Sequence, residues 1–256
     1  MQESLHKLQN PSDCSSARKI VCNLNKGCGF GCQLHHVVYC TVVAMATERT
    51  LILNSKSWRY ISNTKKSKSL WDAAFLPISN SCLDDSGKER SNWGPESESA
   101  QVLHLPVIDS LRSRPDYLPL AIPEMLSSRL VFVHGAPPVW FIGQIMKYLL
   151  RPTPEIDEFL KEKRKIFGYK HPIVGVHVRR TDKIHSEASL HKLSEYMEYV
   201  EQFYNRLDIW NNRKGSMVKH ERLVYLATDD IAVWKKEVPV YQKLGFKFIG
   251  DDQICK

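Results

Sequence analysis

The sequence predicts an α/β protein with parallel sheets, and three observations lead to this fold class. A Gly-rich loop, GCGFG, separates an apolar strand pattern from a helix near the N-terminus. After Gly168, short β-branched runs alternate regularly with a helical apolar stripe. The chain has 256 residues, of which 43% are hydrophobic and 25% are charged. These values are ordinary for a globular protein and exclude collagen-like, low-complexity and wholly disordered classes.

The N-terminal part is predicted as an open-sheet α/β domain over residues 1–168. It has a strand at 19–24 and a helix at 33–47 that follows the Gly-rich loop. The polar segment 84–100 is predicted as a surface loop, and the proline-rich stretch 106–123 as an extended connector. Two helices follow, at 136–150 with Pro137 and Pro138 at its start, and at 155–167 between Thr153-Pro154 and Gly168.

The second part, residues 169–256, is predicted as a partial nucleotide-binding domain. Strands are expected at 173–178, 223–227 and 246–249, and a helix at 231–244 that is broken near Pro239. A helical stripe lies between the first two strands, at Leu190, Leu193, Met197, Val200, Phe203 and Leu207. The order β-α-β-α-β is the first half of a Rossmann-like fold. Because such a fold normally needs its second half to cover the sheet edge, we expect a truncated chain.

The net charge of +8 favours an anionic partner. Residues 1–150 and 151–256 both carry +4, so no basic tail indicates nucleic acid. The longest apolar run, 37–46, is shorter than the roughly 20 residues that span a bilayer.

Cysteine usage indicates an oxidising compartment. Six cysteines lie between Cys14 and Cys82, and Cys255 stands alone. An even cluster is typical of a disulfide framework, of which 15 connectivities are open. The alternative is zinc bound by Cys28 and Cys32 with His35 or His36. Oxidised cysteines require a signal or an anchor, and no signal sequence begins this chain, so either an anchor lies upstream of a truncated chain or the cysteines are reduced.

Candidate site residues follow two predicted strands. Alternation puts His177 and Arg179 on one face of the first strand and Arg180 on the other. An arginine at a strand end is suited to phosphate, although a salt-bridged strand end is the simpler interpretation. After the next strand, Asp229 and Asp230 are either a helix N-cap or carboxylates that orient the arginine or histidine.

Two further features are weaker. Glu187, in the loop after the basic cluster, is either an exposed loop residue or a general base. The GCGFG loop has anion-binding geometry between a strand and a helix N-terminus, but it lacks the GxGxxG pattern.

The chain resembles a known family at these residues. The stretches GCGFGCQLHHVVYC (27–40), TLILNSKSWRY (50–60), SRPDYLPLAIPE (113–124), HPIVGVHVRRTDK (171–183) and VYLATDD (224–230) are similar to the metazoan α-1,6-fucosyltransferases. The similarity runs through nearly all of the chain in order, and HVRRTDK after a parallel strand is its most specific part.

The resemblance implies a GT-B-like, inverting enzyme of the Golgi lumen that moves fucose from GDP-fucose to the 6-hydroxyl of the innermost GlcNAc of N-glycans. It implies no cofactor and no divalent metal, no nucleic-acid partner, and a type II membrane anchor upstream in a full-length protein that can form a homodimer. Catalytic roles fall on Glu187 as base, Lys183 as its assistant and Arg179 against the leaving phosphate. Donor-binding roles fall on His177, Arg179, Arg180, Gly31, Cys32, Tyr60, Asp229 and Asp230. The implied disulfides are Cys14–Cys82, Cys22–Cys40 and Cys28–Cys32.

Departures from the family pattern leave two alternatives. The residues after Lys183, Ile184-His185-Ser186, diverge, and Asp116 replaces a family proline. Family members also have an N-terminal stem and a C-terminal continuation that supplies further donor contacts. The alternatives are a protein O-fucosyltransferase-like enzyme and an inactive nucleotide- or glycan-binding remnant.

Overall fold

The structure is a computed structural model that describes residues 1–56, 58–61, 69–94, 97–107, 122–181, 189–215 and 220–254. It divides into two compact units, Met1–Asp157 and Glu158–Lys256. The division falls inside the helix Pro154–Phe167, whereas the sequence predicted a domain boundary just after this helix, at residue 168. Among the described residues, no helix has the length and apolar character needed to cross a bilayer.

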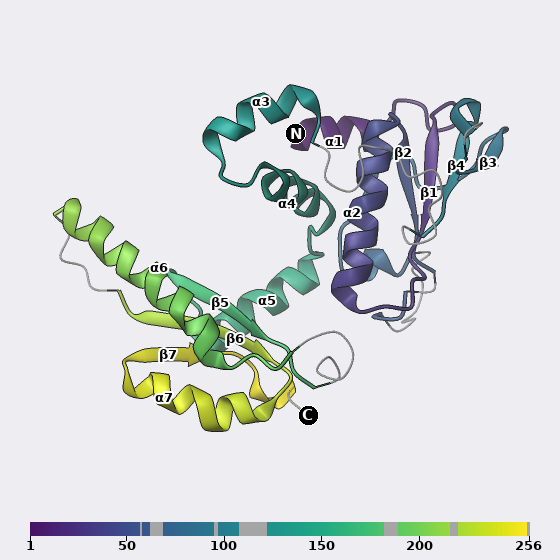
Figure 1. The fold of residues 1–256 in the computed structure, drawn as a ribbon. Coiled ribbons are helices and arrows are strands. Elements are labelled where there is room, and N and C mark those ends of the chain that lie inside the picture. The colour runs from purple at the N-terminus through teal and green to yellow at the C-terminus, as the bar shows by residue number, and fades with distance from the viewer. Residues whose placement is uncertain are drawn as a thin grey trace. The chain divides into compact units, whose positions relative to one another are not determined.

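The first unit is built on a four-stranded parallel sheet of order β2-β1-β4-β3. The strands are β1 (Lys19–Asn23), β2 (Thr50–Asn54), β3 (Arg90–Asn92) and β4 (Val102–Leu105). Helix α2 (Phe30–Ala46) connects β1 to β2 and packs against both, as Figure 1 shows. Ten residues of α2 between Gln33 and Ala44 are buried, so the helix is surrounded by protein on most sides and its sequence is mostly apolar.

The remaining helices of this unit are α1 (Gln2–Gln9), α3 (Glu124–Val133), α4 (Pro137–Leu149) and the start of α5 (Pro154–Phe167). Helices α1 and α2 both contact α4. The start of α5 matches the prediction, because the Thr153 hydroxyl accepts a hydrogen bond from Ile156 N–H at 3.4 Å. Its end matches as well: Gly168 has a φ of +67°, the left-handed conformation that a glycine supplies after a helix.

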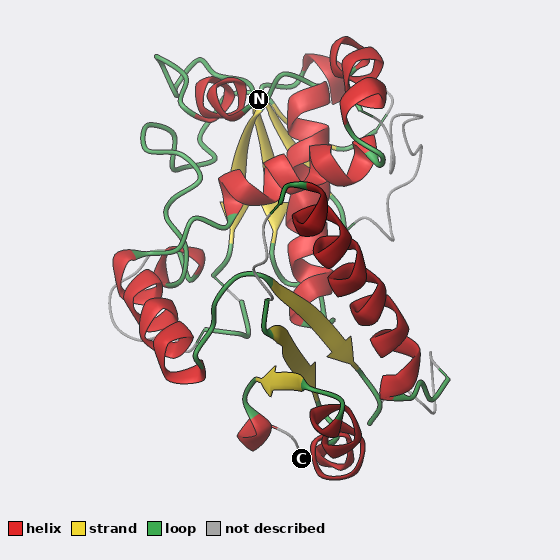
Figure 2. Cartoon of the chain, turned by 90° about the vertical axis from the view of Figure 1, so that its left-hand side faces the viewer, coloured by secondary structure: helices red, strands yellow, loops and turns green. Residues whose placement is uncertain are grey.

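The second unit has a three-stranded parallel sheet of order β5-β6-β7. The strands are β5 (Ile173–Val178), β6 (Arg222–Thr228) and β7 (Phe246–Ile249). Helices α6 (Leu193–Arg213) and α7 (Val238–Lys243) share one core with the sheet, and Figure 2 shows the strands flanked by helices. The α/β class with parallel sheets is therefore confirmed.

Two local predictions were wrong. Segment 84–100 is not only a loop, because β3 lies within it and pairs with β4. The helix after β6 does not break near Pro239; it contains a π-helical turn, Val233–Glu237, and continues into α7 with Pro239 in its first turn.

A candidate anion-binding site at the ends of strands β5 and β6

The ends of β5 and β6 lie side by side because the two strands are parallel and in register. Val178 pairs with Thr228, so the residues that follow each strand leave the sheet at the same edge. Ligands of open α/β sheets bind outside this carboxyl edge. The candidate residues Arg179, Arg180, Asp229 and Asp230 therefore belong to one small region.

The exposure pattern of β5 follows the predicted alternation. Val176, Val178 and Arg180 are buried, whereas His177 and Arg179 are exposed on the other side. The buried valines pack with α6, which fixes the strand and so fixes the direction of the exposed side chains. His177 and Arg179 consequently present a cationic and polar face to solvent.

Asp229 joins the two strand ends through hydrogen bonds. Its Oδ2 forms an ion pair with Nη1 of Arg179 at 2.5 Å and accepts hydrogen bonds from both the N–H and the hydroxyl of Thr181. Its Oδ1 accepts the Arg180 N–H at 2.9 Å. Burial alone would raise the pKa of Asp229, but the hydrogen bonds from Thr181 and Arg180 outweigh it and lower the pKa. The carboxylate is thus ionised and orients Arg179, which is one of the two interpretations offered by the sequence.

Arg180 lies on the buried side of the strand end, and its side chain is 6% exposed. Its Nη1 donates to Glu237 at 2.6 Å and to Asp230 at 3.2 Å. Its Nε and Nη2 both donate to the carbonyl oxygen of His191, at 3.0 and 2.7 Å. The hydrogen bond that Arg180 donates to Glu237 is the largest cause of a raised Arg180 pKa.

Asp230 serves as a helix cap as well as a partner of Arg180. Its Oδ1 accepts the Ala232 N–H at 2.8 Å at the start of the helix that follows β6. Its Oδ2 faces Arg180. Both of the roles that the sequence left open for the Asp229-Asp230 pair are therefore present, one in each residue. Glu237 was missed by sequence reasoning, since nothing in its local pattern distinguishes it from a helix-surface glutamate.

The Gly-rich loop of the first unit leads into the N-terminus of α2. Gly29 is the N-cap residue of the helix, and Gly31 is exposed in its first turn. Tyr60 donates its hydroxyl to the carbonyl oxygen of Cys28 at 3.3 Å and contacts the ring of Phe30 edge-on. A Cβ at Gly31 would meet no atom of the described chain within 4 Å, so packing within that chain does not require a glycine there.

Six cysteines form the three disulfides that the family resemblance implies. These are Cys14–Cys82, Cys22–Cys40 and Cys28–Cys32. The zinc interpretation needed free thiolates at Cys28 and Cys32, and the disulfide removes them. Among the residues the structure describes, the grouping with metal-ligand types is Cys22, His36 and Cys40, and its two sulfurs are bonded to each other.

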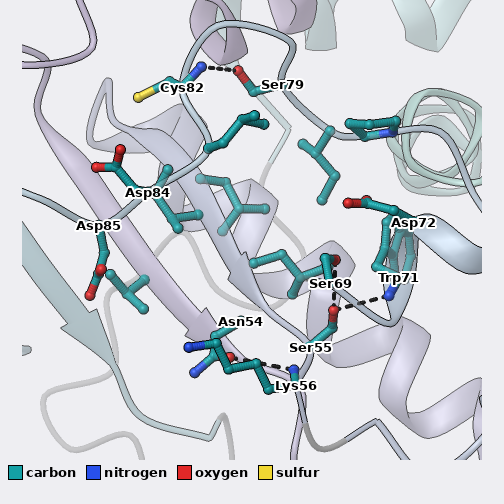
Figure 3. A pocket seen from close by; sticks show the side chains of 17 residues that line it. Asn54, Ser55, Lys56, Ser69, Trp71, Asp72, Ser79, Cys82, Asp84 and Asp85 are labelled. Atoms are coloured by element: carbon teal, nitrogen blue, oxygen red, sulfur yellow. Dashed lines mark hydrogen bonds between the residues drawn. The ribbon is translucent and has the colours of Figure 1, made fainter. Parts of the chain in front are cut away.

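A separate hollow of about 370 Å³ lies against the first sheet. Figure 3 shows Asp84 and Asp85 on one side of it and Asp72 on the other. Burial raises the pKa of Asp72, against a hydrogen bond from Ser69. Asp84 and Asp85 form ion pairs with Lys19 and Arg90. None of the residues predicted to bind a donor lines this hollow.

The predicted catalytic pair cannot be placed. Glu187 and Lys183 lie outside the described residues, as does Cys255. The donor-site positions that the structure does describe fall into two groups, one in each unit: Gly31, Cys32 and Tyr60 in the first, and His177, Arg179, Arg180, Asp229 and Asp230 in the second.

The fold and the strand-end cluster define an α/β protein in which an exposed arginine, paired with a carboxylate, stands at the carboxyl edge of a parallel sheet, where ligands of open α/β sheets bind. The family model described as "Alpha-(1,6)-fucosyltransferase N- and catalytic domains" matches residues 1–256. The chain belongs to the alpha-(1,6)-fucosyltransferase family.

Known relatives are similar over most or all of this chain. The alpha-(1,6)-fucosyltransferase of Drosophila melanogaster is 51% identical over 256 residues, which are 100% of this chain and 39% of the relative. That of Caenorhabditis elegans is 39% identical over 250 residues, which are 95% of this chain and 43% of the relative. The chain thus spans about two fifths of the length of these curated relatives. Among solved structures, fucosyltransferase NodZ from Bradyrhizobium aligns with 93% of this chain and 79% of its own, at 14% identity and a TM-score of 0.46.

Proposed function

We propose that the protein to which this chain belongs transfers fucose from GDP-fucose to the 6-hydroxyl of the innermost GlcNAc of N-glycans. Membership of the family supports the reaction class. The observation that carries the proposal is the exposed Arg179 guanidinium, held at a strand end by the ionised Asp229. A guanidinium in this position is suited to the diphosphate of a nucleotide-sugar donor.

The proposed reaction is an inverting displacement. The acceptor O6 attacks C1 of fucose while the bond from C1 to the β-phosphate oxygen breaks, and GDP leaves with the bonding electrons. The proton of the 6-hydroxyl passes to the carboxylate of Glu187, with Lys183 in the role of its assistant. Arg179 opposes the charge that grows on the departing phosphate, which lowers the energy of the transition state.

The other assignments extend this proposal. The second unit is the first half of a Rossmann-like nucleotide-sugar domain in a GT-B-like enzyme, and its β5-β6-β7 order supports this. His177, Gly31, Cys32 and Tyr60 contact the donor, because they match family positions and are exposed or partly exposed. The proposed reaction needs no divalent metal. The protein works in the Golgi lumen on a type II membrane anchor, and the disulfides support such an oxidising compartment. It can also form a homodimer.

The decisive experiment compares acceptors in the full-length protein. We expect transfer from GDP-fucose to a GlcNAc-terminated biantennary glycopeptide, no transfer to a folded EGF-type domain, and an unchanged rate in EDTA. Transfer to the EGF-type domain instead would identify a protein O-fucosyltransferase. GDP binding with no transfer to either acceptor would identify a nucleotide-binding remnant. An EDTA-sensitive rate would contradict the metal-independent mechanism.

A further inference from the structure

We propose that Glu237 is a positioning residue for this site, acting through Arg180, and that Arg180 is itself a positioning residue rather than a ligand of the donor. The inference rests on the proposed function, which supplies the reaction that the pair would support. It starts from the two carboxylate oxygens of Glu237, which bind two segments that are far apart in the sequence.

The first oxygen of Glu237 accepts a hydrogen bond from Nη1 of Arg180 at 2.6 Å. The second accepts the backbone N–H of Leu193, the first residue of α6, at 2.7 Å. Arg180 in turn donates twice to the carbonyl oxygen of His191. One ion pair therefore fixes the end of β5 and the start of α6 at the same time.

The two segments held by Glu237, at Arg180 and at His191–Leu193, lie on either side of the part of the sequence that carries the proposed base. The Arg180 end is continuous with Arg179 and Thr181, which bind Asp229. The His191–Leu193 end follows the segment that carries Glu187, the proposed base. Glu237 thus anchors the chain on both sides of the residues to which the proposed chemistry belongs.

The ion pair also keeps Asp230 available for its own role. Arg180 lies closer to Glu237, at 2.6 Å, than to Asp230, at 3.2 Å. Asp230 meanwhile caps the next helix through Ala232. Without Glu237, Asp230 would be the remaining described carboxylate on the buried guanidinium. It would be drawn toward Arg180, and the neighbouring Asp229 would shift with it.

The π-helical turn explains how Glu237 reaches this position. Glu237 is the last residue of the turn Val233–Glu237, which comes directly before α7. A π turn adds a residue to the helical repeat and so changes the direction of the side chains that follow it. Val233 and Val238 remain in the core on either side, while Glu237 faces Arg180 and α6. Such turns occur frequently at functional sites.

The test uses Glu237→Gln in the full-length protein, because glutamine keeps the shape and removes the charge. With the oxygen kept toward Leu193, its amide N–H₂ would face the Arg180 guanidinium, so donor would meet donor. We expect kcat/KM for GDP-fucose to fall by about 10–100-fold, the scale on which small misplacements act. Glu237→Asp keeps the charge but is one methylene shorter, so its kcat/KM should lie between those of wild type and Glu237→Gln. Glu162→Gln, an exposed glutamate on α5, is the matched control and should behave as wild type.

Two further measurements separate positioning from a loss of folded protein. The assays are run at a temperature at which circular dichroism shows both proteins fully folded, and GDP affinity is measured by calorimetry. A double-mutant cycle combines Glu237→Gln with Arg180→Lys. If the two residues act as a unit, the losses in kcat/KM should not add, and the double variant should be no worse than the worse single variant.

The outcomes distinguish this inference from the proposed function. If wild type is active and fully folded Glu237→Gln retains kcat/KM within twofold, the inference is wrong while the function stands. If Glu237→Gln loses activity only at higher temperatures, at which circular dichroism shows part of it unfolded, Glu237 only stabilises the fold and the inference is also wrong. If wild type neither binds GDP nor transfers fucose, the proposed function fails. Amide hydrogen exchange at Leu193 and Thr181 then still decides whether Glu237 holds both segments, since unchanged protection in Glu237→Gln would refute it.

Discussion

Replacing Asp229 with asparagine tests the strand-end site most directly. Asparagine has the shape of aspartate, so Asp229→Asn removes a charge without leaving a cavity. The substitution acts on a carboxylate whose side chain is 18% exposed and which accepts hydrogen bonds from three consecutive residues, Arg179, Arg180 and Thr181. The size of the effect follows from how its two oxygens are used.

The two oxygens carry unequal numbers of hydrogen bonds. Oδ2 accepts three, from Arg179 and twice from Thr181, whereas Oδ1 accepts the Arg180 N–H. The asparagine will therefore put its NH₂ group at the Oδ1 position, where it faces a backbone N–H that has lost its acceptor. An unsatisfied buried donor costs about 1–3 kcal/mol. The ion pair with Arg179, which is 43% exposed, adds at most about 1 kcal/mol. We expect a total loss of about 1–4 kcal/mol in the free energy of unfolding.

Urea unfolding at pH 7 measures this difference, with an unchanged m-value as evidence that the folded state is intact. Folding lowers the pKa of Asp229 from its ordinary value of 3.8, so its stabilising contribution is present above that pH and is lost as pH falls through the folded pKa. The gap between wild type and Asp229→Asn should therefore close in acid. Asp208→Asn is the control, since Asp208 makes one part-exposed pair with Arg222 at 3.4 Å. If Asp229→Asn loses no more unfolding free energy than Asp208→Asn, the hydrogen bonds of Asp229 do not stabilise the fold to the extent expected.

Three further predictions test the remaining assignments. Arg179→Lys should weaken GDP binding in calorimetry and lower turnover by orders of magnitude, because an ammonium cannot form a bidentate pair with phosphate; near-normal affinity would contradict the role. Gly31→Ala should keep or raise thermal stability, by up to about 1 kcal/mol, yet raise KM for GDP-fucose, whereas Gly143→Ala in α4 should change stability alone. Removing Cys14–Cys82, with a sequence separation of 68, should cost about 4 kcal/mol in denaturant unfolding, against about 2 kcal/mol for Cys28–Cys32 with a separation of 4; equal losses would argue against the loop-entropy explanation.

The elements that sequence patterns predicted well are those whose cause is local. Strands β5 and β7 have the predicted bounds because each is a short run of β-branched or aromatic residues next to a glycine or a turn. Helix α5 has the predicted ends because Thr153-Pro154 and Gly168 are specific signals for starting and ending a helix. In these cases the residues that decide the structure lie within the element itself.

The elements that were missed depend on distant partners. Strand β3 is the tripeptide Arg90-Ser91-Asn92, which has neither apolar residues nor periodicity. It is a strand because its backbone pairs with β4, ten residues further along the chain. The disulfide pairing is a similar case, since spacing alone left 15 connectivities open and only the family resemblance reduced them to one.

In the candidate site too, the features that depend on local sequence were predicted and those that depend on distant residues were not. His177 and Arg179 were predicted to share a face because alternation within one strand determines it, and the burial of Val178 and Arg180 agrees. The role of Arg180 depends instead on Glu237, 57 residues away, and on a π-helical turn that changes the side-chain direction after Val233. A sequence pattern with a period of 3.6 residues assigns Glu237 to the wrong helical face once one residue has been added to the turn. An arginine that follows a strand can bind a ligand or hold the site together, and its burial together with its carboxylate partner decides between these roles.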